Sequence, residues 1–211
     1  MITIVDYGMG NLGSIRNMLA RIGVPSIISS EAHALSTASA IILPGVGAFD
    51  RAMENLDERG LLPVLNDRVL GAKVPVLGIC LGMQLFALDS EEGTRPGLGW
   101  IDAHVVRFSF PADGVRRRLP HMGWNSVLVR KQSDILDDRY EDSRYYFVHN
   151  YHVRCRTTED ILAATEYGGV EFHSAVLKAN IMGTQFHPEK SHKYGMRLLS
   201  GFARLTAGAT G

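Results

Sequence analysis

The sequence is poor in cysteine and has no long apolar segment. Only Cys80 and Cys155 occur among 211 residues, too few for the disulfide framework of a small secreted protein. No apolar run reaches the roughly 18 residues of a membrane span. The N-terminus lacks the basic and apolar regions of a signal peptide. These absences predict a protein of the reducing cytoplasm that does not enter a membrane.

An excess of charge is also absent. Lys and Arg together number 22, as do Asp and Glu, so the formal net charge is zero. A neutral chain offers no general attraction for nucleic acid or for an anionic membrane surface. The histidines are scattered without the spacing of metal ligands, so we expect neither a metal nor another cofactor. The length and the 45% hydrophobic share suit a single domain over residues 1–211.

In the first half of the chain, apolar runs alternate with helical patterns. We expect strands at 2–6, 25–29, 40–43 and 74–79, and helices at 11–22, 49–58, 61–71 and from residue 80 to about 90,. This order predicts an open, mostly parallel α/β sheet with its functional residues at the carboxyl ends of the strands.

After residue 93 the pattern changes to short strands separated by turns. These are expected at 100–108, 124–130, 145–151, 161–167, 172–177 and 181–186, before a closing helix at 191–205,. The second half therefore predicts an antiparallel or mixed β extension of the sheet.

A candidate nucleophile lies between the fourth strand and the helix that follows it. Gly78 and Gly82 flank Cys80 in the pattern G-x-C-x-G, which corresponds to a nucleophile elbow with sulfur in place of oxygen. A sharp strand-to-helix turn leaves no room for side chains two residues before and after the nucleophile. A small buried cysteine at a helix boundary would give the same local pattern.

A thiol nucleophile needs a base and a group that orients the base. His187 and Glu189 follow the last strand-like run and are two residues apart, so an extended backbone would point both side chains the same way. His149 also ends a strand-like run and is the next candidate for the base. An ordinary surface loop would explain the His-Pro-Glu sequence equally well when it is taken alone.

An oxyanion hole would complete such a site. Pro44-Gly45-Val46-Gly47 follows a strand, so its backbone N–H groups can face the elbow. The N–H of Leu81, directly after the nucleophile, would be the second donor.

A competing motif lies near the N-terminus. Gly8, Gly10 and Gly13 fit G-x-G-x-x-G after a strand, and Glu31 follows about 20 residues later,. A dinucleotide-binding module is therefore an alternative of a different class. Because Asp6 and Tyr7 precede the first glycine and Glu31 lies beyond its strand, we favour a tight β–α turn near the active-site edge.

Taken together, three motifs resemble the class I (triad) glutamine amidotransferases: Pro44-Gly-Val-Gly, Gly78-Ile-Cys-Leu-Gly-Met-Gln84 and Phe186-His-Pro-Glu-Lys-Ser191. Two further segments, 120–125 and 146–151, resemble the glutaminase subunits of imidazole glycerol phosphate synthases. The resemblance spans the chain and implies a flavodoxin-like fold. It also implies hydrolysis of glutamine to glutamate and ammonia through a γ-glutamyl thioester, with Cys80, His187 and Glu189 as the triad.

The same resemblance implies the remaining site residues. Val46 and Leu81 would form the oxyanion hole. The substrate-binding positions would be Gly47, Gln84, Glu92, Asn150 and Tyr151, although the position of Asn150 is usually Ser or Thr in the family. The docking face for a partner would comprise Pro120, His121, Met122, Trp124, Asn125, Tyr146 and Lys190.

The implied partner is a (β/α)8-barrel cyclase, which would form a heterodimer with this chain and use its ammonia in histidine biosynthesis. A paralogous branch, which segments 6–14 and 190–195 also resemble, instead feeds ammonia to a sugar amidotransferase for surface polysaccharides. A stand-alone peptidase or γ-glutamyl hydrolase on a similar sheet is a further alternative within the thiol-hydrolase class.

Overall fold

The computed structural model describes residues 1–136 and 143–207. Within them, eleven strands join one sheet, whose main path runs β2-β1-β3-β4-β13-β12-β10-β6-β5. Its parallel part consists of β1 (Ile2–Val5), β2 (Ser26–Ser29), β3 (Ala40–Gly45), β4 (Val76–Cys80) and β13 (Ile181–Thr184). Gly45 pairs with Cys80 on one side of β4, and Thr184 pairs with Ile79 on the other. The ends of β3 and β13 therefore flank the cysteine.

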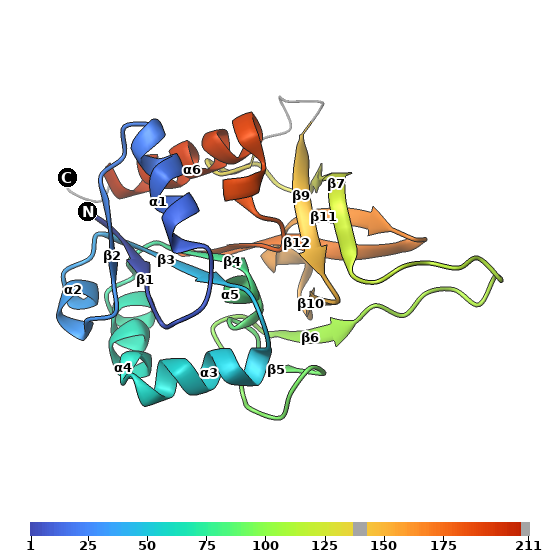
Figure 1. Ribbon diagram of the computed structural model, residues 1–211, viewed down its shortest axis with the longest axis horizontal. Helices are drawn as coiled ribbons and strands as arrows, with labels where there is room; N and C mark the ends of the chain where they lie inside the picture. The colour runs from blue at the N-terminus through green and yellow to red at the C-terminus, as the bar shows by residue number, and fades with distance from the viewer. Residues whose placement is uncertain (137–142, 208–211) are drawn as a thin grey trace.

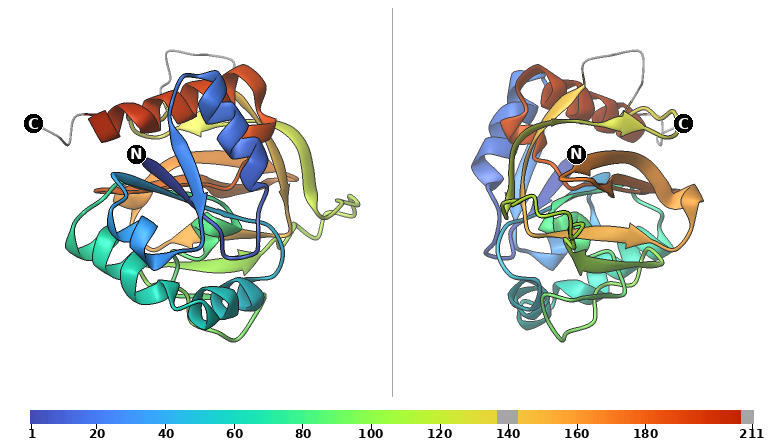
Figure 2. Two further views of the ribbon diagram at one scale, coloured as in Figure 1. Left: turned by 60° about the vertical axis from the view of Figure 1, so that its left-hand side comes forward. Right: turned by 90° about the vertical axis from the view of Figure 1, so that its right-hand side faces the viewer.

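Helices cover both faces of the parallel part (Figures 1 and 2). One face carries α1 (Leu12–Arg21) and α6 (His192–Ala207), and the other carries α2 (Ala32–Ser36), α3 (Phe49–Glu58) and α4 (Leu61–Asn66). Each layer has its own apolar core, with Leu19 and Phe202 in one and Phe49 and Leu65 in the other. Among the described helices, none is long and apolar enough to cross a membrane.

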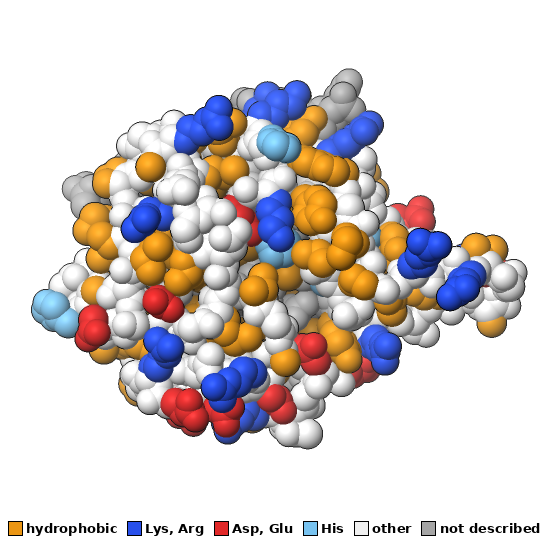
Figure 3. All heavy atoms as spheres, viewed as in Figure 1, with side chains coloured by type: hydrophobic (Ala, Val, Ile, Leu, Met, Phe, Trp, Pro, Cys, Tyr) orange, Lys and Arg blue, Asp and Glu red, His pale blue; other side chains and the backbone are white. Residues whose placement is uncertain are grey.

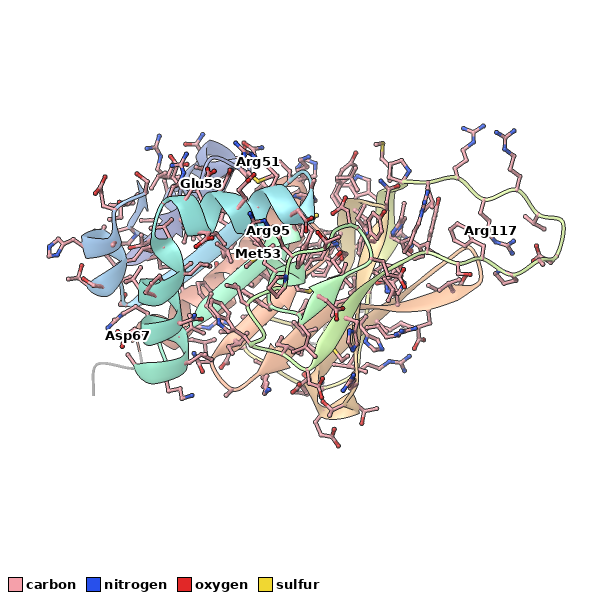
Figure 4. All side chains as sticks on the ribbon, turned by 90° about the horizontal axis from the view of Figure 1, so that it is seen from below. Arg51, Met53, Glu58, Asp67, Arg95 and Arg117 are labelled. Atoms are coloured by element: carbon pink, nitrogen blue, oxygen red, sulfur yellow. The ribbon has the colours of Figure 1, made fainter. Side chains whose placement is uncertain are left out.

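The second half adds antiparallel strands, as expected. These are β6 (Ala103–Arg107), β8 (Leu128–Val129), β10 (Tyr151–Cys155), β11 (Ile161–Tyr167) and β12 (Val170–Lys178). The short β5 (Asp89–Ser90) pairs with β6 in parallel. A separate antiparallel ribbon pairs β7 (His121–Ser126) with β9 (Arg144–His149). A long loop, which carries Arg117, projects from the molecule between β6 and β7 (Figure 4). The expected α/β fold with a mostly parallel sheet and a β extension is thus confirmed.

Several details differ from the sequence-based expectation. The helix after Cys80 does not reach residue 90, because α5 spans only Leu81–Gln84. Segment 97–101 returns here, and its N–H groups donate to the carbonyls of Leu85 and Phe86 among others, so tertiary hydrogen bonds replace further helical ones. The strand expected at 124–130 is divided between β7 and β8. The short elements α2, β5 and β10 were not expected as separate elements.

The turn from β4 into α5 forces the backbone of Cys80 into an unusual conformation, with φ 54° and ψ −109°. Side chains on both neighbouring glycines would collide with fixed groups. A Cβ on Gly78 would lie 2.6 Å from the Phe86 ring, and one on Gly82 would lie 1.8 Å from the Leu43 carbonyl oxygen. The expected steric reason for G-x-C-x-G therefore holds in the structure.

We predict that Gly82→Ala lowers the free energy of unfolding by about 1–3 kcal/mol, since the extra methyl must displace the backbone of β3. Gly13→Ala provides a matched control in α1, where an added Cβ meets nothing within 4 Å. It should stabilise the protein by about 0.5–1 kcal/mol, because Gly is unfavourable within a helix. Urea unfolding of both variants measures the difference. Equal stabilities would contradict the steric account of the turn.

Candidate active site

Cys80 lines a cavity of about 220 Å³ at the carboxyl edge of the parallel strands. The cavity is lined by Val46, Gly47, Cys80, Leu81, Gln84, Glu92, Val148, His149, Asn150 and Tyr151. It is smaller than the roughly 300–1,000 Å³ of pockets for drug-sized ligands and suits a ligand the size of an amino acid. The structure thus brings the predicted nucleophile, both predicted oxyanion residues and all five predicted substrate-binding residues together at one cavity.

The predicted base and its orienting carboxylate lie beside this cavity. The Nδ1 atom of His187 is 2.8 Å from Oε1 of Glu189, and their side chains are only 1% and 2% exposed. Residues Pro188–Lys190 form a 3-10 turn, so the pair is not joined by the extended backbone that the sequence suggested. The tight turn brings the carboxylate back to the imidazole and gives the same contact by a different geometry.

The electrostatics of His187 differ from those of an ordinary buried histidine. Burial opposes the charged imidazole, but Cys80 and the Glu189 carboxylate outweigh it and raise the pKa of His187 to about 10. The Nε2 atom is buried and makes no hydrogen bond of ordinary geometry, so it is available for a reacting group. The arrangement favours an imidazolium at His187, with a proton ready for a leaving group,.

The backbone of β3 closes one side of the cavity. The Tyr7 hydroxyl donates to the Pro44 carbonyl at 2.6 Å, and a Cβ on Gly45 would lie 2.6 Å from that hydroxyl and 2.9 Å from the Gly82 nitrogen. The strand before Val46 is therefore held tightly between the β1–α1 turn and α5. Val46 itself is exposed at the rim.

Two predicted substrate-binding residues are held by hydrogen bonds. The Gln84 amide nitrogen donates to the Tyr151 carbonyl and to Oε1 of Gln185, each at 3.0 Å. This leaves the Gln84 carbonyl oxygen as its free polar group. Glu92 accepts from the Phe49 N–H at 3.0 Å, and partial burial raises the pKa of its carboxyl. A positively charged ligand group beside Glu92 would stabilise the carboxylate and so offset the effect of burial.

The loop that carries Glu92 is anchored to α3 by Asp50, a residue that sequence reasoning missed. The Asp50 carboxylate accepts from the backbone N–H groups of Thr94 and Arg95 at about 3 Å, and these bonds lower its pKa. The Arg95 side chain also lies against α3, 3.8 Å from Glu54 (Figure 4). No local sequence pattern predicts a contact between Asp50 and Thr94, which are 44 residues apart.

Ser191 is a second supporting residue whose role was not foreseen, although it belongs to the quoted His-Pro-Glu motif. Its hydroxyl donates to the His187 carbonyl at 2.6 Å and accepts from the Tyr146 N–H at 3.0 Å. The His187 N–H also donates to the Tyr146 carbonyl. These bonds fasten the base to β9 and fix its position relative to the sheet.

His149, the alternative base, is occupied by other contacts. Its Nδ1 lies 2.8 Å from the Tyr151 carbonyl and its Nε2 lies 3.0 Å from Nδ1 of His121. Burial lowers the pKa of His149 well below its usual value. With both ring nitrogens engaged, His149 cannot exchange a proton with Cys80 without breaking this network.

The predicted docking residues divide into exposed and buried sets. Met122 and Trp124 are 60% and 46% exposed, and hydrophobic side chains gather beside β7 and β9 on the face shown in Figure 3. His121 is only 2% exposed, because alternation along β7 points it inward. His121 therefore lies on the buried side of the ribbon, and its contact with a partner stays a prediction.

The rest of the predicted face surrounds these residues. Trp124 stacks on His192 with ring centroids 5.6 Å apart, and Lys190 lies over the Tyr146 ring at 5.7 Å. Pro120 and Asn125 are half-buried at the same ribbon. Tyr146 on β9 lies next to the turn Pro188–Lys190, since β9 contacts that turn, whereas the Asn125 amide donates to the Glu166 carbonyl and faces buried His121.

The first glycine motif serves packing in this structure. A Cβ on Gly10 would lie 3.2 Å from the Pro44 ring, and one on Gly8 would lie 3.0 Å from the Arg59 guanidinium. The turn supports the strand that leads to Val46, as the tight-turn interpretation expects. In residues 1–136 and 143–207, no group of three or more His, Cys, Asp or Glu residues could hold a metal ion.

Comparison with known proteins gives consistent matches. Residues 3–204 match the family described as Glutamine amidotransferase class-I. The chain is 51% identical to imidazole glycerol phosphate synthase subunit HisH 2 of Methanococcus maripaludis, over 97% of this chain and 99% of that protein. It is 47% identical to the HisH 2 subunit of Pseudomonas aeruginosa, over 97% and 100%.

Solved structures show the same fold at lower identity. One described as a glutamine amidotransferase superposes with a TM-score of 0.73 at 20% identity and covers 98% of each chain. The glutaminase domain of Trypanosoma brucei CTPS with bound acivicin gives a TM-score of 0.62, also at 20% identity, and covers 96% of this chain and 93% of that one.

The buried histidines make a prediction about acid stability. Burial lowers the pKa of His152 from 6.5 to about 4, so between these values the unfolded chain binds a proton that the folded protein does not. Stability is therefore lost as the pH falls through this window, by about 3 kcal/mol for His152 at 1.36 kcal/mol per pKa unit.

Replacing His152 with Phe should reduce the loss of unfolding free energy between pH 6.5 and pH 4 by about this amount. Urea unfolding at several pH values measures it. The control is His33→Gln, which changes an exposed histidine and should leave the pH dependence as it is. An unchanged pH dependence in His152→Phe would contradict the prediction.

Proposed function

The chain belongs to the class I glutamine amidotransferases, and we propose that it is the glutaminase subunit of an imidazole glycerol phosphate synthase. The observation that carries this proposal is the cavity that joins Cys80 to the five expected substrate-binding residues. Two relatives, which are 51% and 47% identical to this chain over nearly their whole length, are named as subunits of imidazole glycerol phosphate synthase. Their names support this synthase as the one that the chain serves. Residues 1–211 act as one glutaminase domain in the cytoplasm.

The reaction begins with attack of the Cys80 thiolate on the side-chain carbonyl carbon of glutamine. The carbon–sulfur bond forms and the carbonyl electron pair moves to oxygen, where the N–H groups of Val46 and Leu81 stabilise the negative charge. The carbon–nitrogen bond then breaks, and the His187 imidazolium gives its proton to the leaving nitrogen, which departs as ammonia. The raised pKa of His187 suits this acid role.

Hydrolysis of the γ-glutamyl thioester restores the enzyme. Water attacks the thioester carbon while neutral His187 takes the proton of the water, held in orientation by Glu189. Breaking of the carbon–sulfur bond releases glutamate and the Cys80 thiolate. Gly47, Gln84, Asn150 and Tyr151 bind the substrate, and Glu92 receives its α-ammonium group.

The partner in this proposal is a (β/α)8-barrel cyclase that receives the ammonia before water can protonate it. The exposed Met122 and Trp124, together with Tyr146 and Lys190, form the docking face. This face adjoins the His187 turn, so a docked partner sits close to the leaving ammonia. The relatives are named as subunits, which supports a two-subunit enzyme.

We predict that the chain releases glutamate from glutamine with a barrel cyclase and its ribulosyl ligand, and that Cys80→Ala abolishes this activity. A coupled glutamate dehydrogenase assay measures turnover with and without the cyclase, and Cys155→Ala is the control for the second thiol. Turnover that needs Cys80 but ignores the cyclase points instead to a sugar amidotransferase partner. Absence of turnover in every mixture contradicts the proposed function.

The Asp50 anchor predicts a selective effect on substrate binding. Asp50→Ala releases the segment at Thr94 and Arg95 and loosens the position of Glu92, so KM for glutamine should rise by about tenfold, the effect of losing roughly 1.4 kcal/mol. The triad is untouched, so kcat should change by less than about threefold. Glu54→Ala, on the same helix, is the control. A fall in kcat with unchanged KM would contradict this interpretation.

A further inference from the structure

Gln185 lies beside the nucleophile but has no part in the mechanism described above. It is the residue after β13, and its side chain is fully buried. Its amide nitrogen lies 3.6 Å from the Cys80 sulfur, within reach of an N–H···S hydrogen bond. Its backbone N–H donates to the Ser174 carbonyl at 2.9 Å, which fixes the position of the residue in the sheet.

The orientation of the Gln185 amide is determined by its neighbours. The Tyr151 carbonyl can only accept a hydrogen bond, so the Gln84 atom 3.0 Å from it must be the amide nitrogen,. The same nitrogen then donates its second hydrogen to Gln185, which must present its oxygen to Gln84. The Gln185 nitrogen is left facing the sulfur, and no alternative amide flip satisfies all three contacts.

A pair of buried histidines extends this network. His149 Nδ1 donates to the Tyr151 carbonyl at 2.8 Å, so its Nε2 accepts from His121 Nδ1 at 3.0 Å. His121 Nε2 faces the Asn125 amide nitrogen at 3.3 Å, and that nitrogen also donates to the Glu166 carbonyl. Every donor in this chain of hydrogen bonds faces an acceptor if both imidazoles are neutral. Burial lowers the pKa of each histidine and so favours the neutral form.

We propose that Gln185 is a further catalytic residue whose amide N–H binds the Cys80 sulfur, and that Gln84, His149 and His121 are positioning residues for this amide. The proposal rests on the glutaminase function proposed above. A donor at the sulfur stabilises the thiolate before attack and again when the carbon–sulfur bond of the thioester breaks, because a hydrogen bond to an anion is stronger than one to a neutral thioester sulfur. Gln185 therefore acts in both halves of the reaction.

The test is the pH profile of alkylation of Cys80 by iodoacetamide in the full chain. The thiolate is the reacting species, so the profile reports stabilisation of the anion. Gln185→Met keeps the length of the side chain but removes the donor. We expect the midpoint of the profile to rise by about one pH unit, equivalent to an approximately tenfold slower reaction below the midpoint.

Two features make the readout specific. Mass spectrometry of the Cys80 peptide separates it from Cys155, whose pKa burial raises to about 12. Thr184→Val is the matched control, because Thr184 is equally buried in the adjacent position and donates to the Phe186 carbonyl, not to the sulfur. Its alkylation profile should coincide with that of the wild type.

Turnover with the cyclase gives a second readout. Gln185 is not among the residues that line the cavity, so Gln185→Met should lower kcat about tenfold with KM for glutamine within about twofold of wild type. If Gln185→Met does not unfold cooperatively, Gln185→Asn replaces it, since its shorter amide cannot reach the sulfur. An unshifted alkylation profile in a folded variant overturns the proposal.

The positioning residues are tested by a matched pair of histidines. His149→Phe and His152→Phe both replace buried imidazoles that pack against Phe108 and Phe172, but only His149 holds the Tyr151 carbonyl. His149→Phe should slow the alkylation of Cys80 below the midpoint by about threefold. His152→Phe should leave this rate unchanged. Equal profiles would remove the histidines from the proposal. Alkylation needs no glutamine, so this result is independent of whether the proposed function fails.

Discussion

The strained backbone of Cys80 is the constraint around which the rest of the site is arranged. A non-glycine residue at φ 54° costs about 1–3 kcal/mol and persists only where surrounding contacts determine it. Here the two flanking glycines allow β3 and α5 to approach so closely that an added methyl on Gly82 would lie 1.8 Å from the Leu43 oxygen. The same close approach places the end of β3 at the cavity, so one tight turn presents the sulfur and positions the backbone opposite it.

The supporting layer comes from segments far apart in the sequence. Tyr7 holds the Pro44 carbonyl, Asp50 holds the loop of Glu92, and Ser191 fastens His187 to β9. Each support is a hydrogen bond to the backbone, which fixes where a segment lies but leaves the reacting side chains free. The glycine-rich turn after β1 belongs to this layer, since its Gly10 packs on Pro44. Its dinucleotide-like spacing is explained by close packing at the active edge of the sheet.

The sequence-based expectations agree best with the structure where the contacts are local. The glycines around Cys80, the His187–Glu189 separation and the apolar periods of the parallel strands all express contacts within a few residues. The expectations failed where distant segments compete for the same backbone groups. Segment 97–101 ends the helix after Gln84 by taking the carbonyls of Leu85 and Phe86. Gln185 and Cys80, 105 positions apart, meet only because β13 and β4 are neighbours in the sheet, a pairing that no local pattern specifies.

Burial alone does not determine which histidine can act as the base. His149 ends β9, His187 follows β13 by three residues, and both are buried, yet their pKa values shift in opposite directions. The difference lies in their partners. His149 faces a carbonyl and another imidazole, and the carbonyl only partly offsets the effect of burial. His187 lies between Glu189 and Cys80, which together outweigh the effect of burial on its pKa,. A positive charge on His149 would place a proton on its Nε2 atom and so oppose the hydrogen bond that Nε2 accepts from His121. Keeping His149 neutral therefore preserves its contact with His121, while its Nδ1 atom holds the Tyr151 carbonyl to which Gln84 also donates.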